Sequence, residues 1–155
     1  MVGVCNYERR VAARREVVWN ILVNCQKWRN IPALADWFGH VEWFQGEPWK
    51  VGSRILIEHY WPVRRDVRLV LVSFTPPQEF AWIGHDRGLT AHQHTYLKQI
   101  DEKSCLLSSS MSYASNPDIV VVPEVGPMAE RILSTFLDAI ADHSEQISSG
   151  ARKAG

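Results

Sequence analysis

The pattern of hydrophobic and polar positions changes character twice along the first forty residues. Val4–Ala12 alternates loosely between apolar and polar positions, which predicts a first strand. Glu16–Asn24 then has its apolar side chains on one helical face, which predicts a short helix. In Gln26–Phe38 large apolar residues recur every third position, but Pro32 lies among them. Since proline removes a backbone donor and clashes with the preceding turn, we expect a short, broken second helix there.

From Gly39 onward, short apolar runs alternate with turn residues, and this predicts an antiparallel meander. The six predicted strands are His40–Gln45, Arg54–Trp61, Asp66–Phe74, Glu79–His85, Ala91–Ile100 and Ser104–Ala114. The segments between them are rich in Gly, Pro, Asp and Glu, the residues that favour turns.

The last part of the chain predicts a long amphipathic helix that begins near Val125, with Gly150 as its expected end. Its apolar stripe is wide and includes Met128, Ile132 and Phe136. Between it and the last strand, the apolar segment Ile119–Val122 is expected either to cover a site or to pack under the helix. A single helix with so wide a stripe needs a sheet to cover it, so we expect an α+β domain over residues 1–155.

Composition narrows the class of function. Seventeen basic and seventeen acidic residues give a formal charge of zero, so no clustered positive field favours nucleic acid. No apolar run approaches the roughly 18 residues that span a bilayer, so we expect no membrane insertion and a cytoplasmic protein. The three cysteines are far apart and form no CxxC pair, which disfavours a disulfide framework or a zinc knuckle. Seven tryptophans in 155 residues suit either a wide interior or a bulky, solid core.

Element order and several local motifs resemble the SRPBCC or START-like helix-grip superfamily. The motifs are Val18-Trp19, Trp28 before a proline, Val51-Gly52-Ser53, Pro76-Pro77 before a strand with Trp82, and His94-Thr95-Tyr96-Leu97 before a turn. The plant allergens of this superfamily carry a glycine-rich loop between their second and third strands, where this chain has Gly46-Glu47-Pro48-Trp49-Lys50. The resemblance is therefore nearer to the bacterial polyketide cyclase/dehydrase-like branch. It implies a seven-stranded curved antiparallel sheet wrapped around the long C-terminal helix, with a cavity between them.

Strand alternation sorts the candidate cavity residues onto one face. In Ser104–Ala114 the serine-rich face suits water, so Leu107, Ser109, Met111 and Tyr113 should point inward. In Arg54–Trp61 the more apolar face holds Ile57, His59 and Trp61. In the next strand Leu69 belongs to the corresponding set with Val67 and Leu71, although Val70, Val72 and Phe74 make the other face equally apolar. The resemblance adds His92, His94 and Tyr96 as inward residues, and Trp19, Trp61 and Trp82 as the aromatic wall. Together with Met128, Ile132 and Phe136 from the helix, these residues form the predicted ligand-binding set.

Three functions fit such a cavity. The first is binding of a hydrophobic small molecule such as a lipid, a polyketide or an aromatic metabolite. The second is a cyclase, aromatase or dehydratase in which His94, His92 and Tyr96 act as acid–base groups. The third is a regulatory module of the same fold that needs no ligand. His92 and His94 with His59 also have the ligand types of a zinc site, but no acidic or cysteine pattern supports one, so we expect no metal and no cofactor. The sequence does not decide the oligomeric state, and a homodimer is compatible with it.

Overall fold

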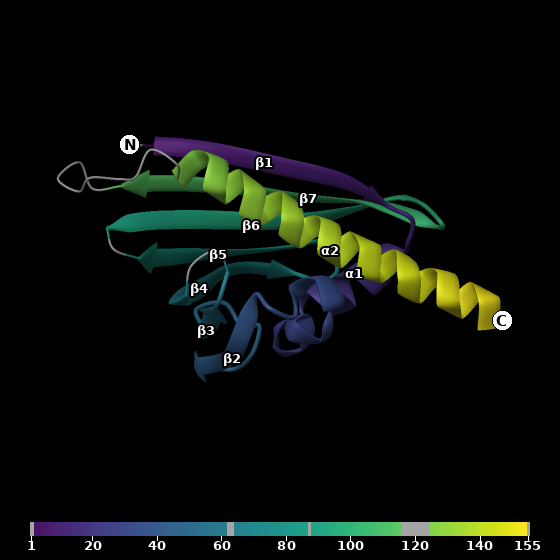
Figure 1. Ribbon diagram of the computed structural model, residues 1–155, viewed down its shortest axis with the longest axis horizontal. Helices are drawn as coiled ribbons and strands as arrows, with labels where there is room; N and C mark the ends of the chain where they lie inside the picture. Colours follow the sequence, from purple (N-terminus) through teal and green to yellow (C-terminus); the bar gives the residue numbers. More distant parts are fainter. Residues whose placement is uncertain (1, 62–63, 87, 116–124, 155) are drawn as a thin grey trace.

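The computed structural model describes residues 2–61, 64–86, 88–115 and 125–154, and it contains one curved sheet with a long helix across it (Figure 1). In chain order the elements are β1 (Val2–Val11), α1 (Arg15–Leu22), the 3-10 helices η1 (Cys25–Asn30) and η2 (Pro32–Leu34), β2 (Phe38–Gln45), β3 (Arg54–His59), β4 (Arg65–Thr75), β5 (Glu79–Asp86), β6 (Leu89–Asp101), β7 (Ser104–Ser115) and α2 (Val125–Ala154).

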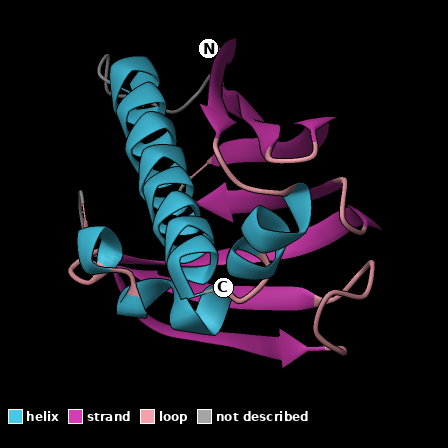
Figure 2. Ribbon diagram, turned by 90° about the vertical axis from the view of Figure 1, so that its right-hand side faces the viewer, coloured by secondary structure: helices cyan, strands magenta, loops and turns pink. Residues whose placement is uncertain are grey.

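The sheet has seven antiparallel strands in the order β1-β7-β6-β5-β4-β3-β2. From β2 to β6, each strand pairs with the next one along the chain, as the meander predicts. The first strand, β1, pairs with the last strand, β7. Figure 2 shows all the helices on one side of the sheet, with α2 crossing it. This is the helix-grip fold that the sequence predicted.

The structure tests two details of the predicted helices. The segment around Pro32 forms two separate 3-10 helices, which agrees with a broken helix and places the proline at the start of the second one. The predicted end of the last helix is wrong, because α2 continues through Gly150 to Ala154. Gly150 does not take the left-handed conformation by which a glycine ends a helix, so the helix passes through it. The segment Ile119–Val122 lies outside the described residues.

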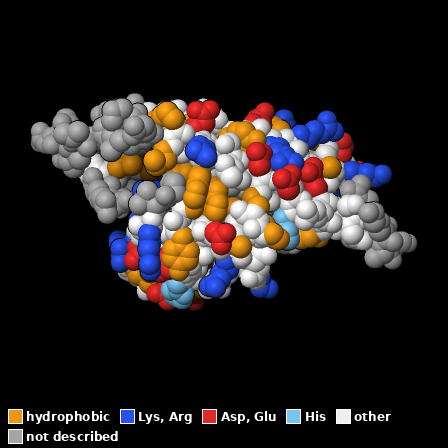
Figure 3. Space-filling view, viewed as in Figure 1, with side chains coloured by type: hydrophobic (Ala, Val, Ile, Leu, Met, Phe, Trp, Pro, Cys, Tyr) orange, Lys and Arg blue, Asp and Glu red, His pale blue; other side chains and the backbone are white. Residues whose placement is uncertain are grey.

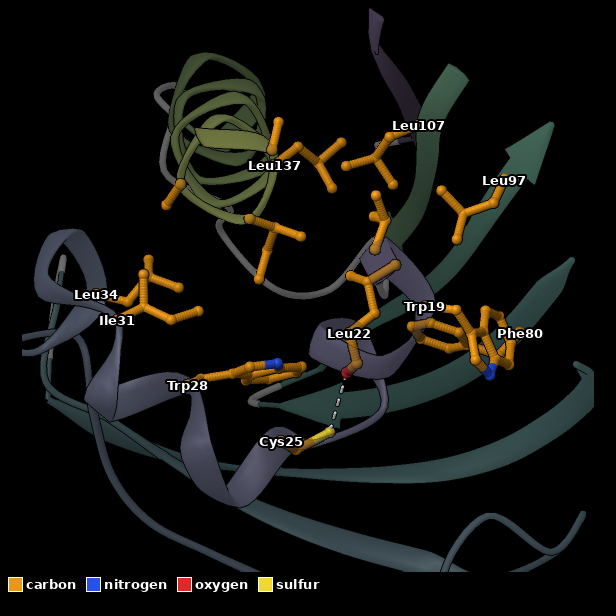
Figure 4. Packing of buried hydrophobic residues seen from close by; sticks show 14 of the residues in the cluster. Trp19, Leu22, Cys25, Trp28, Ile31, Leu34, Phe80, Leu97, Leu107 and Leu137 are labelled. Carbon is orange, nitrogen blue, oxygen red and sulfur yellow. Dashed lines mark hydrogen bonds between the residues drawn. The ribbon is translucent and has the colours of Figure 1, made fainter. Parts of the chain in front are cut away.

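The core lies between the concave face of the sheet and the helices. Leu137 and Ile140 of α2 and Leu107 of β7 are completely buried, and Figure 4 shows Leu137 turned from the helix towards the sheet. Trp19 of α1 lies against Phe80 of β5, with ring centroids 5.9 Å apart. Burial of such large apolar surfaces is the main stabilising contribution in a domain of this size.

Polar contacts join α2 to the edge strand β1. The Arg9 guanidinium contacts carboxylates of Asp138, Asp142 and Glu145 at 3.3, 2.6 and 3.0 Å. The Tyr7 hydroxyl donates a hydrogen bond to Asp138 Oδ1 at 2.6 Å. In Figure 3, acidic and basic side chains lie next to one another along this seam between helix and strand. The acidic side chains beside the apolar stripe of α2 therefore hold the first strand as well as facing water.

Candidate functional site: a cavity between the sheet and α2

A cavity of about 240 Å³ lies between the concave face of the sheet and α2. Nine of the predicted ligand-binding residues line it, namely Ile57, His59, Leu69, Trp82, Met111, Tyr113, Met128, Ile132 and Phe136. The inward direction predicted for one face of β3 and of β7 is thus confirmed, and in β4, where both faces were apolar, the cavity is lined by the face with Val67 and Leu69. Arg65 and Met128 line the cavity and are also exposed, so the cavity reaches the surface near the start of α2.

The inward direction predicted for His92, His94 and Tyr96 is wrong. In β6 the cavity is lined by Leu89, Ala91, Gln93 and Thr95, and the alternate positions point to the opposite, convex side. There His94 stands opposite Ser110 and His92 opposite Ser112, on the serine-rich face of β7. His94 Nε2 donates a hydrogen bond to Glu79 Oε2 at 2.8 Å, so that imidazole already has a carboxylate partner outside the cavity.

The prediction carried the family pattern over to β6, whereas the register of β6 with β7, which changes near their turn, places these side chains on the other face. Asp101 pairs with Ser104, but Gln99 pairs with Cys105, so β6 holds one more residue than β7 over this stretch. Without that extra residue, Tyr96 would stand opposite the inward Ser109. A shift of one residue turns every side chain of a strand to its other face.

Four other predicted residues lie on the inner side but are not themselves lining residues of the cavity. Leu107 is completely buried in the core, and Trp19 packs on Phe74 and Phe80. Trp61 follows the end of β3 and stacks on Trp37, a lining residue, at 4.3 Å between ring centroids. The fourth residue, Ser109, belongs to the hydrogen-bonded wall described next.

The polar groups at the inner end of the cavity bond to one another. The Trp82 indole donates to Gln93 Oε1 at 3.0 Å, and Gln93 Nε2 donates to Ser109 Oγ at 3.3 Å. Ser109 Oγ also lies 3.2 Å from Thr95 Oγ1. Because these groups satisfy one another, this part of the wall presents few polar atoms that need a ligand.

His59 is the histidine that lines the cavity. Its ring packs edge-on against Phe38, with centroids 5.1 Å apart. Burial and, to a smaller extent, the positive charge of Arg65 lower the pKa of His59 from 6.5 to about 4, while a backbone hydrogen bond at Trp61 acts in the opposite direction. The imidazole is therefore neutral at pH 7, with one nitrogen that donates and one that accepts.

Several lining residues were missed by the sequence reasoning. They are Trp28, Trp37, Phe38, Arg65, Val67, Phe80, Leu89, Ala91, Gln93, Thr95, Ala129 and Leu133. Arg65 precedes the predicted start of its strand, and the face of β6 that holds Gln93 and Thr95 was assigned to water. The pairing of β6 with β7 identifies that face, because Gln93 and Thr95 stand opposite the inward residues Met111 and Ser109. The sequence does not reveal this pairing, because β6 has one more residue than β7 near their turn.

The cysteines do not offer a nucleophile to the cavity. None of the three lines it, and all are free thiols. Burial raises the pKa of Cys25 and raises that of Cys105 to about 11. Such thiols are poor nucleophiles at neutral pH. Within residues 2–61, 64–86, 88–115 and 125–154, no group of three or more His, Cys, Asp or Glu side chains has the arrangement of a metal site.

Solved structures from several functional classes share this fold. A START superfamily protein from Mycobacterium smegmatis matches with a TM-score of 0.75 at 12% identity, over 93% of this chain and 98% of that one. The Zhui aromatase/cyclase from Streptomyces sp. R1128 matches with a TM-score of 0.75 at 13% identity, over 94% and 95% of the two chains. Norcoclaurine synthase from Thalictrum flavum, in complex with dopamine and hydroxybenzaldehyde, matches with a TM-score of 0.69 at 16% identity, over 92% and 86%.

At these identities the likeness establishes the helix-grip fold alone. No protein-family model matches the sequence. No curated protein matches it either. Among the helices in the described ranges, none combines the length and the apolar character needed to span a bilayer.

Proposed function

We propose that this helix-grip domain binds an apolar small molecule with an aromatic ring in the cavity between its sheet and α2. The observation that carries the proposal is the lining of that cavity, which is mainly aromatic and aliphatic, with a few polar groups such as His59, Gln93 and Tyr113. Apolar walls with a small number of placed polar groups are typical of small-molecule sites.

The volume limits the size of the ligand. A cavity of roughly 150 Å³ lined by Leu, Ile and Phe holds benzene. The cavity here, at about 240 Å³, therefore suits a substituted ring or a fused pair of rings better than a long lipid chain. The complex of norcoclaurine synthase with dopamine and hydroxybenzaldehyde supports this size class, because both of its ligands are single substituted rings.

A second candidate is an enzyme of cyclase, aromatase or dehydratase type that uses the same cavity. Its support is the neutral imidazole of His59, which lines the cavity together with the Tyr113 phenol. A neutral imidazole can accept a proton, and a phenol can donate a hydrogen bond to a developing oxyanion. In this alternative the acid–base group is His59. Conversion of a bound ligand that stops in His59→Gln, with binding retained, would favour the enzyme.

The binding proposal is tested with a neutral probe, 2-naphthol, whose affinity is followed by tryptophan fluorescence. Ala91 lines the cavity from β6, so Ala91→Phe fills it and should weaken binding at least tenfold. Ala114→Phe is the matched control, since Ala114 is exposed on the opposite face of the sheet beside β6. Native mass spectrometry of protein from its own host would identify the retained ligand and give the oligomeric state. Equal binding by both folded variants, or no binding by the wild-type protein, would overturn the proposal.

We also infer that the protein works in a reducing compartment such as the cytoplasm. All three of its cysteines are free, and two of them are buried in the core. Oxidising compartments favour paired cysteines, whereas cytoplasmic proteins keep buried thiols of this kind.

A further inference from the structure

The charge carried by the described lining residues is positive. Among the residues that the structure describes, Arg65 is the one formally charged side chain that lines the cavity, and no Asp or Glu lines it. In the view of Figure 3, basic side chains around the left ends of β3 and β4 stand next to acidic ones. The positive charge at the opening therefore comes from Arg65 itself, and a negatively charged group of a ligand would be its complement.

Arg65 and His59 form a pair across two strands at this opening. They stand directly opposite each other in the β3–β4 register, and both line the cavity. Opposite residues of an antiparallel pair have their Cβ atoms about 5 Å apart, which places the guanidinium and the imidazole within reach of one small anionic group. A guanidinium carries five N–H donors, so a partner of Arg65 within the protein does not prevent it from holding a carboxylate as well.

A second cation lies close by. The Arg131 guanidinium of α2 is 5.7 Å from the centroid of the Trp61 ring, and Trp61 stacks on the lining residue Trp37. The inner end of the cavity differs, because Trp82, Gln93 and Ser109 satisfy one another there. The cavity thus has an apolar interior with internally paired polar groups and a cationic opening.

Building on the proposed function, we infer that the ligand is an aromatic organic acid whose ring lies in the cavity and whose carboxylate lies at the opening between Arg65 and His59. The guanidinium supplies the charge and two parallel donors. The neutral imidazole adds one N–H donor. The aromatic part packs against the side chains of β5, β6 and α2.

The test compares two probes of the same shape, 2-naphthoic acid and 2-naphthamide, by titration at pH 7. The acid should bind the wild-type protein at least tenfold more tightly than the amide, because a charge-assisted, bidentate contact is stronger than a neutral one. Arg65→Gln should weaken binding of the acid about tenfold and leave binding of the amide within twofold. Arg64→Gln is the matched control, since Arg64 lies over the exposed Tyr60 ring, 5.5 Å from its centroid, and does not line the cavity.

The outcomes separate this inference from the proposed function. If the wild-type protein binds both probes equally, or if Arg65→Gln keeps the preference for the acid, the inference is wrong and binding in the cavity stands. If Arg64→Gln weakens binding of the acid as much as Arg65→Gln does, the effect comes from the overall charge of the protein and the inference also fails. If neither probe binds, the proposed function fails with it.

Discussion

His94 of β6 and Glu79 of β5 form a hydrogen-bonded pair on the convex side of the sheet, with 2.8 Å between Nε2 and Oε2. Each side chain is about one third exposed, at 36% and 34%. The pair is separated from the cavity by the sheet itself. Its environment indicates a surface contact, although the resemblance to the helix-grip superfamily had implied that His94 points into the cavity.

We therefore expect His94→Ala to leave the affinity for 2-naphthol within twofold of wild type. Its free energy of unfolding should fall by at most about 1 kcal/mol, the usual contribution of a partly exposed ion pair. Fluorescence titration and urea unfolding measure the two quantities, with Ala91→Phe on the same strand as the positive control. A tenfold loss of affinity in folded His94→Ala would contradict the placement of the site.

His59 should make stability depend on pH. In the unfolded chain a histidine takes up its proton near its ordinary pKa of 6.5, whereas folded His59 does so near 4. Between these values the unfolded state binds the additional proton, so stability should fall as the pH is lowered from about 6.5 to about 4. The full effect is on the order of 3 kcal/mol, from a shift of about two and a half pH units.

This contribution is measured by comparing urea unfolding of wild type and His59→Gln at pH 7.0, 5.5 and 4.5. Carboxylates contribute similarly to both proteins, so the difference between their slopes isolates His59. Parallel slopes over this range would show that folding does not lower the pKa of His59. Titration of its ring protons by NMR gives the same pKa directly.

Arg9 should contribute more to stability than its sequence neighbour. Because it contacts three carboxylates of α2 and is only partly exposed, we expect Arg9→Ala to lower the free energy of unfolding by about 1–3 kcal/mol. Arg10→Ala is the control, since Arg10 forms one exposed ion pair, 3.5 Å from Asp101, and a long hydrogen bond of 3.4 Å to Ser104 Oγ, and its loss should cost less than about 0.5 kcal/mol. Equal losses would show that the Arg9 network adds nothing beyond a surface charge.

Gly3 allows Tyr113 to take its place in the cavity wall. The two residues pair across β1 and β7, and a Cβ added at Gly3 would overlap the Tyr113 ring. Gly3→Ala should therefore displace that ring, which lowers stability by about 1–3 kcal/mol. In a Tyr113→Leu background the same change should cost much less. A double-mutant cycle measures the coupling, and additive effects would exclude the contact.

Most of the fold was predictable because its elements follow from the periodicity of apolar residues over many positions and from the turn residues between them. Seven strands, the broken segment at Pro32 and the long final helix all follow from periodicity and turn residues. The inward faces of β3 and β7 were also correct, and in β7 the contrast is clear because Met111 stands between Ser110 and Ser112. The face of β4 stayed open in the sequence, since Leu69 is followed by the equally apolar Val70.

The face of β6 could not be predicted, because both of its faces are polar. His92, His94 and Tyr96 alternate with Gln93 and Thr95, so hydrophobicity does not distinguish them. The face then depends on the register with β7, which the extra residue near Ile100 shifts by one. Ile100 is 45% exposed, an unusual place for isoleucine, and the sequence alone does not reveal that it lies there.

The pairing of β1 with β7 has a consequence for how the chain is made. A ribosome releases the first strand early, but its partner strand and the carboxylates that bind Arg9 are more than ninety residues away in the sequence. The β2–β7 meander can form from neighbouring segments as they emerge, because each of its strands pairs with the next. β1 therefore has no partner strand until β7 has been synthesised, and the cavity wall at Gly3 and Tyr113 is completed only after the rest of the meander has emerged.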